Sequence, residues 1–296
     1  MRRHTVPRAA LALLGAAGAA IVFSGCAAPA ASKAELPPKN EAKLALPLDQ
    51  FSYAQRAHLR DYAEALVEEP CYAEHGIDWP VPWQPAEQDL GASVSAGGAV
   101  IFNTDLAGKY GYHHAPVTYD NSAAWRKFVE ITNATNPPGF DRIMRECQAV
   151  SRKALPLPSQ DAIDYATVAA AQIYDEALLS SDVAQKAAAW AACMSKAGYG
   201  GMAATPDGMP PTDKTDAWQV AVPFTTAGAE ELAVAAADAK CRTVSGWSSA
   251  LYAEEWDRQA DFVRKNASKL LRIRAELADE KKTLLEAVAQ NAPARP

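Results

Sequence analysis

The 296-residue sequence is poor in the side chains that most often perform chemistry, since it has five histidines, five cysteines and only 8% aromatic residues. The spaced motifs of zinc proteases, serine hydrolases, phosphate-binding loops and calcium-binding loops are all missing from it. Its formal net charge of −6 also lacks the positive excess of a non-specific nucleic-acid binder. We therefore expect no nucleic-acid partner, and no catalytic residue is predicted.

Long hydrophobic runs are equally scarce. The longest, residues 9–23, is rich in Ala and Gly and too short for a good membrane-spanning helix. Three arginines precede it, which is the layout of an export signal over residues 1–25. The segment Phe23-Ser24-Gly25-Cys26 then resembles the lipobox of bacterial lipoproteins, in which small residues precede a cysteine that becomes lipid-modified.

This resemblance implies that Cys26 is the acylated, palmitate-bearing first residue of the mature chain. Each buried CH₂ of an acyl chain contributes roughly 0.8 kcal/mol, so the anchor would hold the protein on the outer face of the cytoplasmic membrane. Residues 26–46 are rich in Ala, Pro, Ser, Lys and Glu without apolar periodicity, and we expect a flexible tether. An ordinary cleaved signal with an incidental cysteine is the alternative.

The four remaining cysteines predict disulfides, because an exported chain enters an oxidising compartment. Segments 65–76 and 187–198 share a helix-like layout in which a glycine follows a cysteine by five positions. Each precedes a loop-rich excursion and then a helix that carries the next cysteine. This weak internal repeat predicts one disulfide per half, Cys71–Cys147 and Cys193–Cys241.

A zinc site is the competing interpretation of the same cysteines. The sequence has no Cys-x-x-Cys motif, and we identify no Cys/His pair at ligand spacing. We therefore predict neither a metal nor a cofactor.

Apolar residues recur mostly at helical spacing, for example at Phe140, Ile143, Met144 and Cys147. The sequence therefore predicts a mainly α protein: one helical-bundle domain over residues 47–296. We expect two pseudo-repeated halves, at about 47–155 and 156–250, followed by a long helix over 248–290. Pro70 should kink or restart the helix that precedes Cys71.

Two stretches do not fit a helix, residues 79–118 and 198–224, because proline, glycine and aromatic residues interrupt both. We expect ordered loops there, with a short β-hairpin near 93–105. The helix over 248–290 has no proline or glycine and spaces its apolar residues in a coiled-coil-like way. It either folds back on the body or projects, and a projecting half would favour self-association.

Aromatic residues and histidines gather in the first excursion and suggest a binding surface for a glycan or a peptide. Adjacent histidines on an extended segment point to opposite faces, so they rarely bind one metal together. Core packing of the tryptophans and ordinary loop histidines remain the alternative interpretation. The candidate residues are Trp79, Trp83, Tyr110, Tyr112, His113 and His114.

One resemblance to known proteins covers roughly residues 50–75 and 185–270. Residues 230–241 with Gly246, Trp256 and Asn266, and the Trp-x-x-Cys-Met-x3-Gly motif at 190–198, are similar to a group of uncharacterised actinobacterial lipoproteins. The resemblance implies export, a lipid anchor and a helical body, and it implies no activity.

We therefore predict a lipid-anchored cell-envelope protein that acts as a non-enzymatic binding or scaffolding module, with an envelope protein or a glycan as its partner. An envelope enzyme, such as a metal-assisted hydrolase that uses the His113/His114 loop, is the alternative. A solute-binding lipoprotein of a transporter would fit the anchor, but the alternation of strands and helices typical of such proteins is missing.

Overall fold

The computed structural model describes residues 34–86, 94–116, 118–134, 137–222 and 225–296. The chain divides into two units, Met1–Ser32 and Lys33–Pro296, and all described residues belong to the second unit. The predicted signal peptide, Cys26 and the first part of the predicted tether lie outside the described residues.

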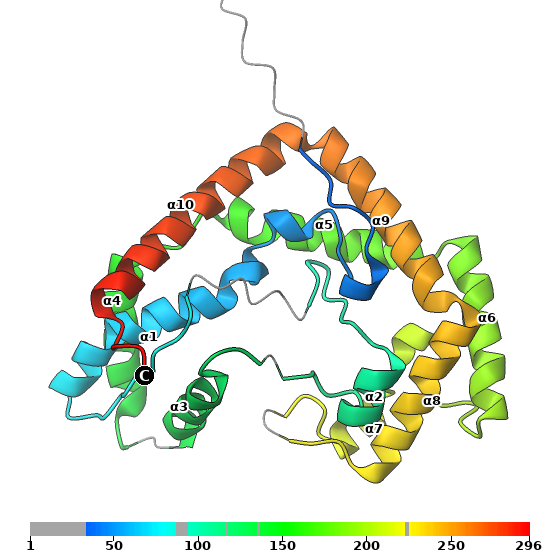
Figure 1. Cartoon of the computed structure of the whole chain (residues 1–296), viewed down its shortest axis with the longest axis horizontal. Helices are drawn as coiled ribbons and strands as arrows, with labels where there is room; N and C mark the ends of the chain where they lie inside the picture. Colours follow the sequence, from blue (N-terminus) through cyan, green and yellow to red (C-terminus); the bar gives the residue numbers. More distant parts are fainter. Residues whose placement is uncertain (1–33, 87–93, 117, 135–136, 223–224) are drawn as a thin grey trace, which may run out of the picture. The chain divides into compact units, whose positions relative to one another are not determined.

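Helices form nearly all of the regular structure in the described ranges, which contain two isolated β-bridges and no strand. The predicted mainly α fold is therefore confirmed. Within the same ranges, no helix combines the length and the apolar character needed to cross a membrane. The α-helices, shown in Figure 1, are α1 (Ala57–Glu74), α2 (Thr104–Tyr110), α3 (Ser122–Ala134), α4 (Phe140–Ala154), α5 (Gln160–Leu178), α6 (Ser181–Lys196), α7 (Thr212–Ala217), α8 (Ala229–Ser245), α9 (Trp247–Lys265) and α10 (Ala267–Asn291).

Helix α1 does not restart at Pro70, one of the two outcomes expected from the sequence, and continues to Glu74. Pro70 removes one backbone donor from the helix. Tertiary contacts hold the last turn in place: the Cys71–Cys147 disulfide ties it to α4, and the Tyr72 side chain is 1% exposed. Packing and a covalent bond therefore outweigh the local penalty of proline.

Each predicted disulfide is present and joins two helices that pack against each other. Cys71–Cys147 links α1 to α4, and Cys193–Cys241 links α6 to α8. Helix α1 also packs against α10, whereas α6 and α8 both contact α9. The two disulfide-linked helix pairs thus lie along different parts of the C-terminal helical segment.

The predicted C-terminal helix occupies the expected residues but is divided at Asn266 into α9 and α10. The Asn266 side chain donates to the Phe262 carbonyl at 2.9 Å and accepts from the Tyr165 hydroxyl at 3.0 Å. Helix α9 packs against α5 and α6, and α10 packs against α1 and α5 (Figure 1). The helix therefore folds back on the body, and most of the apolar stripe that suggested self-association is buried within the chain.

The structured domain begins before Leu46, where the sequence analysis ends the tether. The Asn40 N–H donates to the Tyr252 hydroxyl of α9 at 2.6 Å, and the same hydroxyl donates to the Ala45 carbonyl at 3.0 Å. Lys39 forms an ion pair with Asp257, and Leu46 is 1% exposed. Part of the segment predicted as a tether is thus packed against α9.

The two excursions contain more helix and less hairpin than the sequence suggests. In the first, α2 begins after Asn103, whose side chain accepts from the Leu106 N–H at 2.9 Å. The hairpin predicted near 93–105 is reduced, in the described residues, to one antiparallel bridge between Val94 and Val100. The second excursion contains α7 and a 3-10 turn at Pro206–Gly208.

Candidate functional site

The six residues of the predicted binding surface do not form one surface. Trp79 is a packing residue: its ring stacks on Tyr72 at 4.0 Å and meets Phe128 edge-on at 5.4 Å between centroids. Tyr110 is half-buried at the end of α2, and His114 is exposed. The remaining three residues lie in two separate places that differ in character.

Trp83 lines an open groove with a volume of about 610 Å³. The groove brings together three parts of the chain: the segment after Val81, the turn that precedes α3, and the end of α10. Its lining residues are Trp83, Gln84, Pro85, Ala86, Asp120, Leu285, Val288, Ala289, Ala292 and Arg295.

The apolar part of the groove comes from one stripe of α10. Leu285, Val288 and Ala289 are spaced i, i+3 and i+4, which places them on one face of the helix, and Ala292 follows directly after its end. Val288 is buried in the core, whereas Ala289 is exposed. The core-facing stripe of α10 therefore extends into the groove and leaves an aliphatic surface beside the Trp83 ring.

Gln84 lies in the wall of the groove, where hydrogen bonds within the protein hold it in place. Its backbone N–H donates to the Tyr62 hydroxyl at 3.1 Å, and its Nε2 donates to the carbonyls of Trp83 at 2.6 Å and Asn121 at 3.4 Å. The residue is 2% exposed, yet its Oε1 has no hydrogen-bond partner among the described residues. That oxygen is itself buried, so a ligand in the open groove does not reach it without a movement of the Gln84 side chain.

Arg295 and Asp120 add one charge of each sign to the groove. Arg295 Nη2 lies 2.7 Å from Asp120 Oδ2, and the Arg295 guanidinium lies over the Trp83 ring at 5.0 Å from its centroid. Both charged side chains are more than half exposed, so their ion pair contributes little to stability. It can open for a ligand at small cost.

Sequence reasoning identified Trp83 and missed the rest of the groove. The helix over 248–290 was predicted, but the sequence does not show that its end would lie beside Trp83. Asp120 and Arg295 are 175 positions apart and come together only through the fold.

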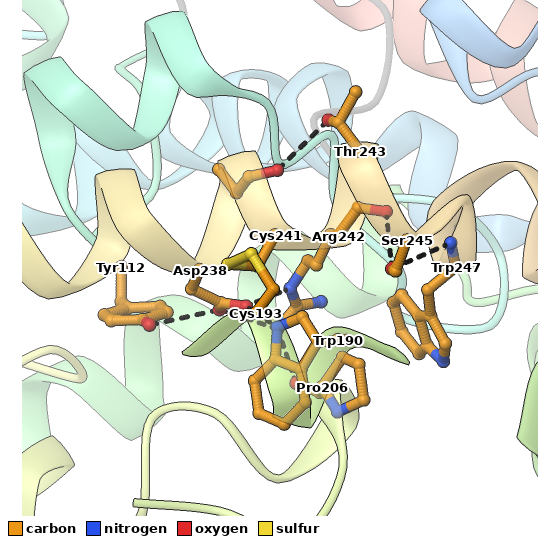
Figure 2. A network of polar contacts seen from close by, with 11 residues as sticks. Tyr112, Trp190, Cys193, Pro206, Asp238, Cys241, Arg242, Thr243, Ser245 and Trp247 are labelled. Carbon is orange, nitrogen blue, oxygen red and sulfur yellow. Dashed lines mark hydrogen bonds and ion pairs between the residues drawn. A yellow bond between two sulfur atoms is a disulfide. The ribbon is translucent and has the colours of Figure 1, made fainter. Parts of the chain in front are cut away.

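Tyr112 belongs to a different place, a closed network around Asp238 of α8 (Figure 2). The Asp238 carboxylate is fully buried and accepts from Trp190 Nε1 at 2.8 Å, from the Tyr112 hydroxyl at 3.1 Å and from Arg242 at 2.8 and 3.0 Å. Burial, and then the Asp238 charge, raise the pKa of the Tyr112 hydroxyl. The carboxylate is fully satisfied within the protein, so we interpret the network as structural.

His113, the residue after Tyr112, is held by both of its ring nitrogens. Nδ1 lies 2.9 Å from the buried Glu231 carboxylate, and Nε2 lies 3.1 Å from the Thr225 hydroxyl oxygen. Both ring nitrogens of His113 are thus engaged by polar groups of the protein, and neither is free for a metal or a substrate.

The histidine that does approach cysteines is His75, whose position before Gly76 at a helix end predicts a capping role from the sequence. Cys71 and His75 are four positions apart at the end of α1, and Cys147 of α4 faces them. The candidate ligand atoms of the three residues all lie within 4.8 Å of one another. The statement that no Cys/His pair stands at ligand spacing was therefore wrong.

Comparison with known proteins adds no family to this description. No protein-family model matches the chain, and no curated protein and no solved structure matches it. The functional argument therefore stands on the residues themselves.

Proposed function

We propose that the protein is a lipid-anchored binding module of the cell envelope, and that its groove beside Trp83 holds an extended peptide segment of another envelope protein. The observation that carries the proposal is the groove itself, where an aliphatic surface of α10 lies beside the Trp83 ring and the exposed Asp120–Arg295 ion pair. An extended peptide can place an apolar side chain on the aliphatic surface and its polar groups beside the ion pair.

A peptide fits this groove better than a glycan. A sugar ring would stack on the face of Trp83, where the Arg295 guanidinium already lies. Sugar hydroxyls also need several hydrogen-bond partners, whereas Leu285, Val288 and Ala289 offer only carbon atoms. The paired charges of Asp120 and Arg295 suit a peptide that carries polar groups beside its apolar anchor.

Membrane attachment is supported by the signal-like residues 1–25 and by Cys26 in its lipobox-like setting. Two disulfides are also typical of a protein that works outside the reducing cytoplasm. Substitution Cys26→Ser should release the protein from the membrane fraction and remove the acyl mass from its N-terminal peptide. Retention of both properties in the variant would exclude this anchor.

The groove is tested with a phage-displayed random-peptide library selected on the full chain. Ala289→Arg blocks the groove at an exposed position, and Gln290→Arg is the matched control, because it adds the same charge one position away and outside the groove. Selected peptides should share an aliphatic residue or proline and lose binding only to the Ala289→Arg variant.

A screen with cell-wall glycans is run on the same three proteins. Glycan binding that Ala289→Arg abolishes would replace the peptide by a sugar ligand. Peptides that bind both arginine variants equally would exclude the groove as the binding site.

The hydrolase alternative depends on the His113/His114 loop. Both nitrogens of His113 are engaged inside the protein, so this alternative gains no support from the geometry. It predicts bound metal in the purified protein and a cell-wall hydrolysis activity that His113→Asn abolishes, and either finding would reinstate it.

A further inference from the structure

We infer that Cys71, Cys147 and His75 form a latent zinc site, which reduction of the Cys71–Cys147 disulfide opens. The inference is independent of the proposed peptide groove. It rests on the convergence of two sulfur atoms and an imidazole within 4.8 Å of one another. Thiolate and imidazole are the ligands that Zn²⁺ prefers in proteins.

Helical geometry explains why the three residues converge. Cys71 lies in the last turn of α1, and His75, four positions later, caps the end of the helix, so that both side chains lie on the same side of it. Cys147 reaches this face from α4. Glu146 precedes it, and Glu146 Oε2 lies 3.3 Å from His75 Nε2, so a carboxylate adjoins the fourth coordination position.

The movement needed to bind zinc is small. In an ideal tetrahedral site, zinc–sulfur bonds of about 2.3 Å place the two thiolate sulfur atoms about 3.8 Å apart. The imidazole nitrogen of such a site lies at a similar distance from each sulfur atom. The ligand atoms already lie within 4.8 Å of one another, so side-chain rotations close the site. A metal can enter from solvent, because the His75 and Glu146 side chains are 32% and 46% exposed.

The chemistry balances with a dithiol as the reductant. The reductant transfers two electrons and two protons to the Cys71–Cys147 bond, which becomes two thiols while the dithiol becomes a disulfide. Zinc then binds as both thiols lose their protons, and neutral His75 supplies the third ligand. The net reaction takes up one Zn²⁺ and releases two protons.

The second disulfide provides an internal control. Around Cys193–Cys241, the described residues include no comparable group of histidine and acidic side chains within ligand distance. Reduction of this disulfide should create two thiols without a third ligand, so the prediction applies to only one of two cysteine pairs in the same chain.

In the test, the purified protein is reduced with a phosphine in the presence of Zn²⁺, and the number of zinc ions bound per chain is measured by native mass spectrometry. A phosphine avoids the competition for zinc that a dithiol reagent would introduce. Four proteins are compared: the wild type, Cys193→Ser/Cys241→Ser, Cys71→Ser/Cys147→Ser and His75→Ala. Co²⁺ replaces Zn²⁺ in a parallel sample, because thiolate-bound tetrahedral cobalt has diagnostic absorption bands.

We expect one zinc per reduced chain in the wild type and in Cys193→Ser/Cys241→Ser, and none in Cys71→Ser/Cys147→Ser. His75→Ala should weaken zinc binding by more than about a hundredfold, because loss of a group that only hydrogen-bonds to a metal ligand already costs about 10–100-fold. Zinc is present throughout reduction, so the measurement also detects zinc binding by a chain that needs the metal to stay folded.

Zinc retention no greater in the wild type than in Cys71→Ser/Cys147→Ser would overturn the inference. Equal affinity in the wild type and in His75→Ala would overturn it as well, because the thiols alone would then account for binding.

Discussion

Glu255 of α9 provides a sharp test of the electrostatics of this core. Its carboxylate is 1% exposed and accepts from Gln259 Nε2 at 3.0 Å, and no cation pairs with it in the described residues. Asp49 from the N-terminal segment and Tyr174 from α5 are the titratable groups that face it. Burial, and then the Asp49 charge, raise the pKa of Glu255 from 4.5 to about 7.

The sign of the effect follows from where the proton is held. Between pH 4.5 and about 7 the folded chain keeps the Glu255 proton and the unfolded chain loses it. The stability that the protonated Glu255 gives to the folded chain is therefore fully present below pH 4.5 and is lost as the pH rises through about 7. At about 1.4 kcal/mol per pKa unit, the loss in the free energy of unfolding amounts to about 3 kcal/mol.

Glu255→Gln should remove this loss, because glutamine imitates the protonated carboxyl group and keeps an oxygen for Gln259. Urea unfolding of the disulfide-intact protein measures the difference between variant and wild type at each pH. The two proteins should be equally stable near about pH 4, and the variant should be more stable by about 3 kcal/mol near about pH 8.

Glu254→Gln is the matched control, because this neighbouring carboxylate is partly exposed and paired with Arg258. It should change stability by about 1 kcal/mol or less at every pH. A stability difference between Glu255→Gln and the wild type that does not vary with pH would refute the reasoning.

Three further predictions, two of them with a control substitution, are also tested by urea unfolding. Asp238→Asn leaves the Arg242 charge buried without its partner and should cost about 3–5 kcal/mol, whereas Asp261→Asn in an exposed pair with Arg264 should cost less than about 1 kcal/mol. Equal effects would show that the Figure 2 network is not buried as described. Gly111→Ala should cost about 3 kcal/mol, because Gly111 has a φ of 63° and an added Cβ would lie 2.3 Å from Glu231 Oε1. Gly108→Ala, with open space around it on α2, should not destabilise the protein; a similar loss at both positions would contradict the described turn. Removal of the Cys193–Cys241 disulfide by serine substitution should cost about 4 kcal/mol for its 48-residue separation, and an unchanged urea midpoint would show that the bond does not constrain the unfolded chain.

The sequence predicts best where a local signal and the tertiary structure agree. The disulfide pairing followed from a short repeat, in which each cysteine-bearing helix is succeeded by an excursion and a second helix. Gly246 ends α8 in a left-handed conformation, with a φ of 74°, as its position after an alanine-rich helix predicts. In both cases the contacts made by the fold reinforce the local preference.

The failures are places where distant contacts outweigh local preference. Pro70 is retained within α1 because a disulfide and a buried tyrosine hold the following turn. Asn266 divides the C-terminal helix because the Tyr165 hydroxyl binds its side chain from α5. The groove was out of reach for a similar reason, since Trp83, Asp120 and Arg295 are neighbours only in the folded chain.

The peptide groove is the central claim, and its most direct test is the affinity of a selected, fluorescently labelled peptide measured by anisotropy. The full chain, Ala289→Arg and Gln290→Arg are titrated side by side. We predict that Ala289→Arg weakens binding at least about tenfold, which corresponds to about 1.4 kcal/mol, whereas Gln290→Arg leaves it unchanged. Equal affinity for all three proteins would contradict the account.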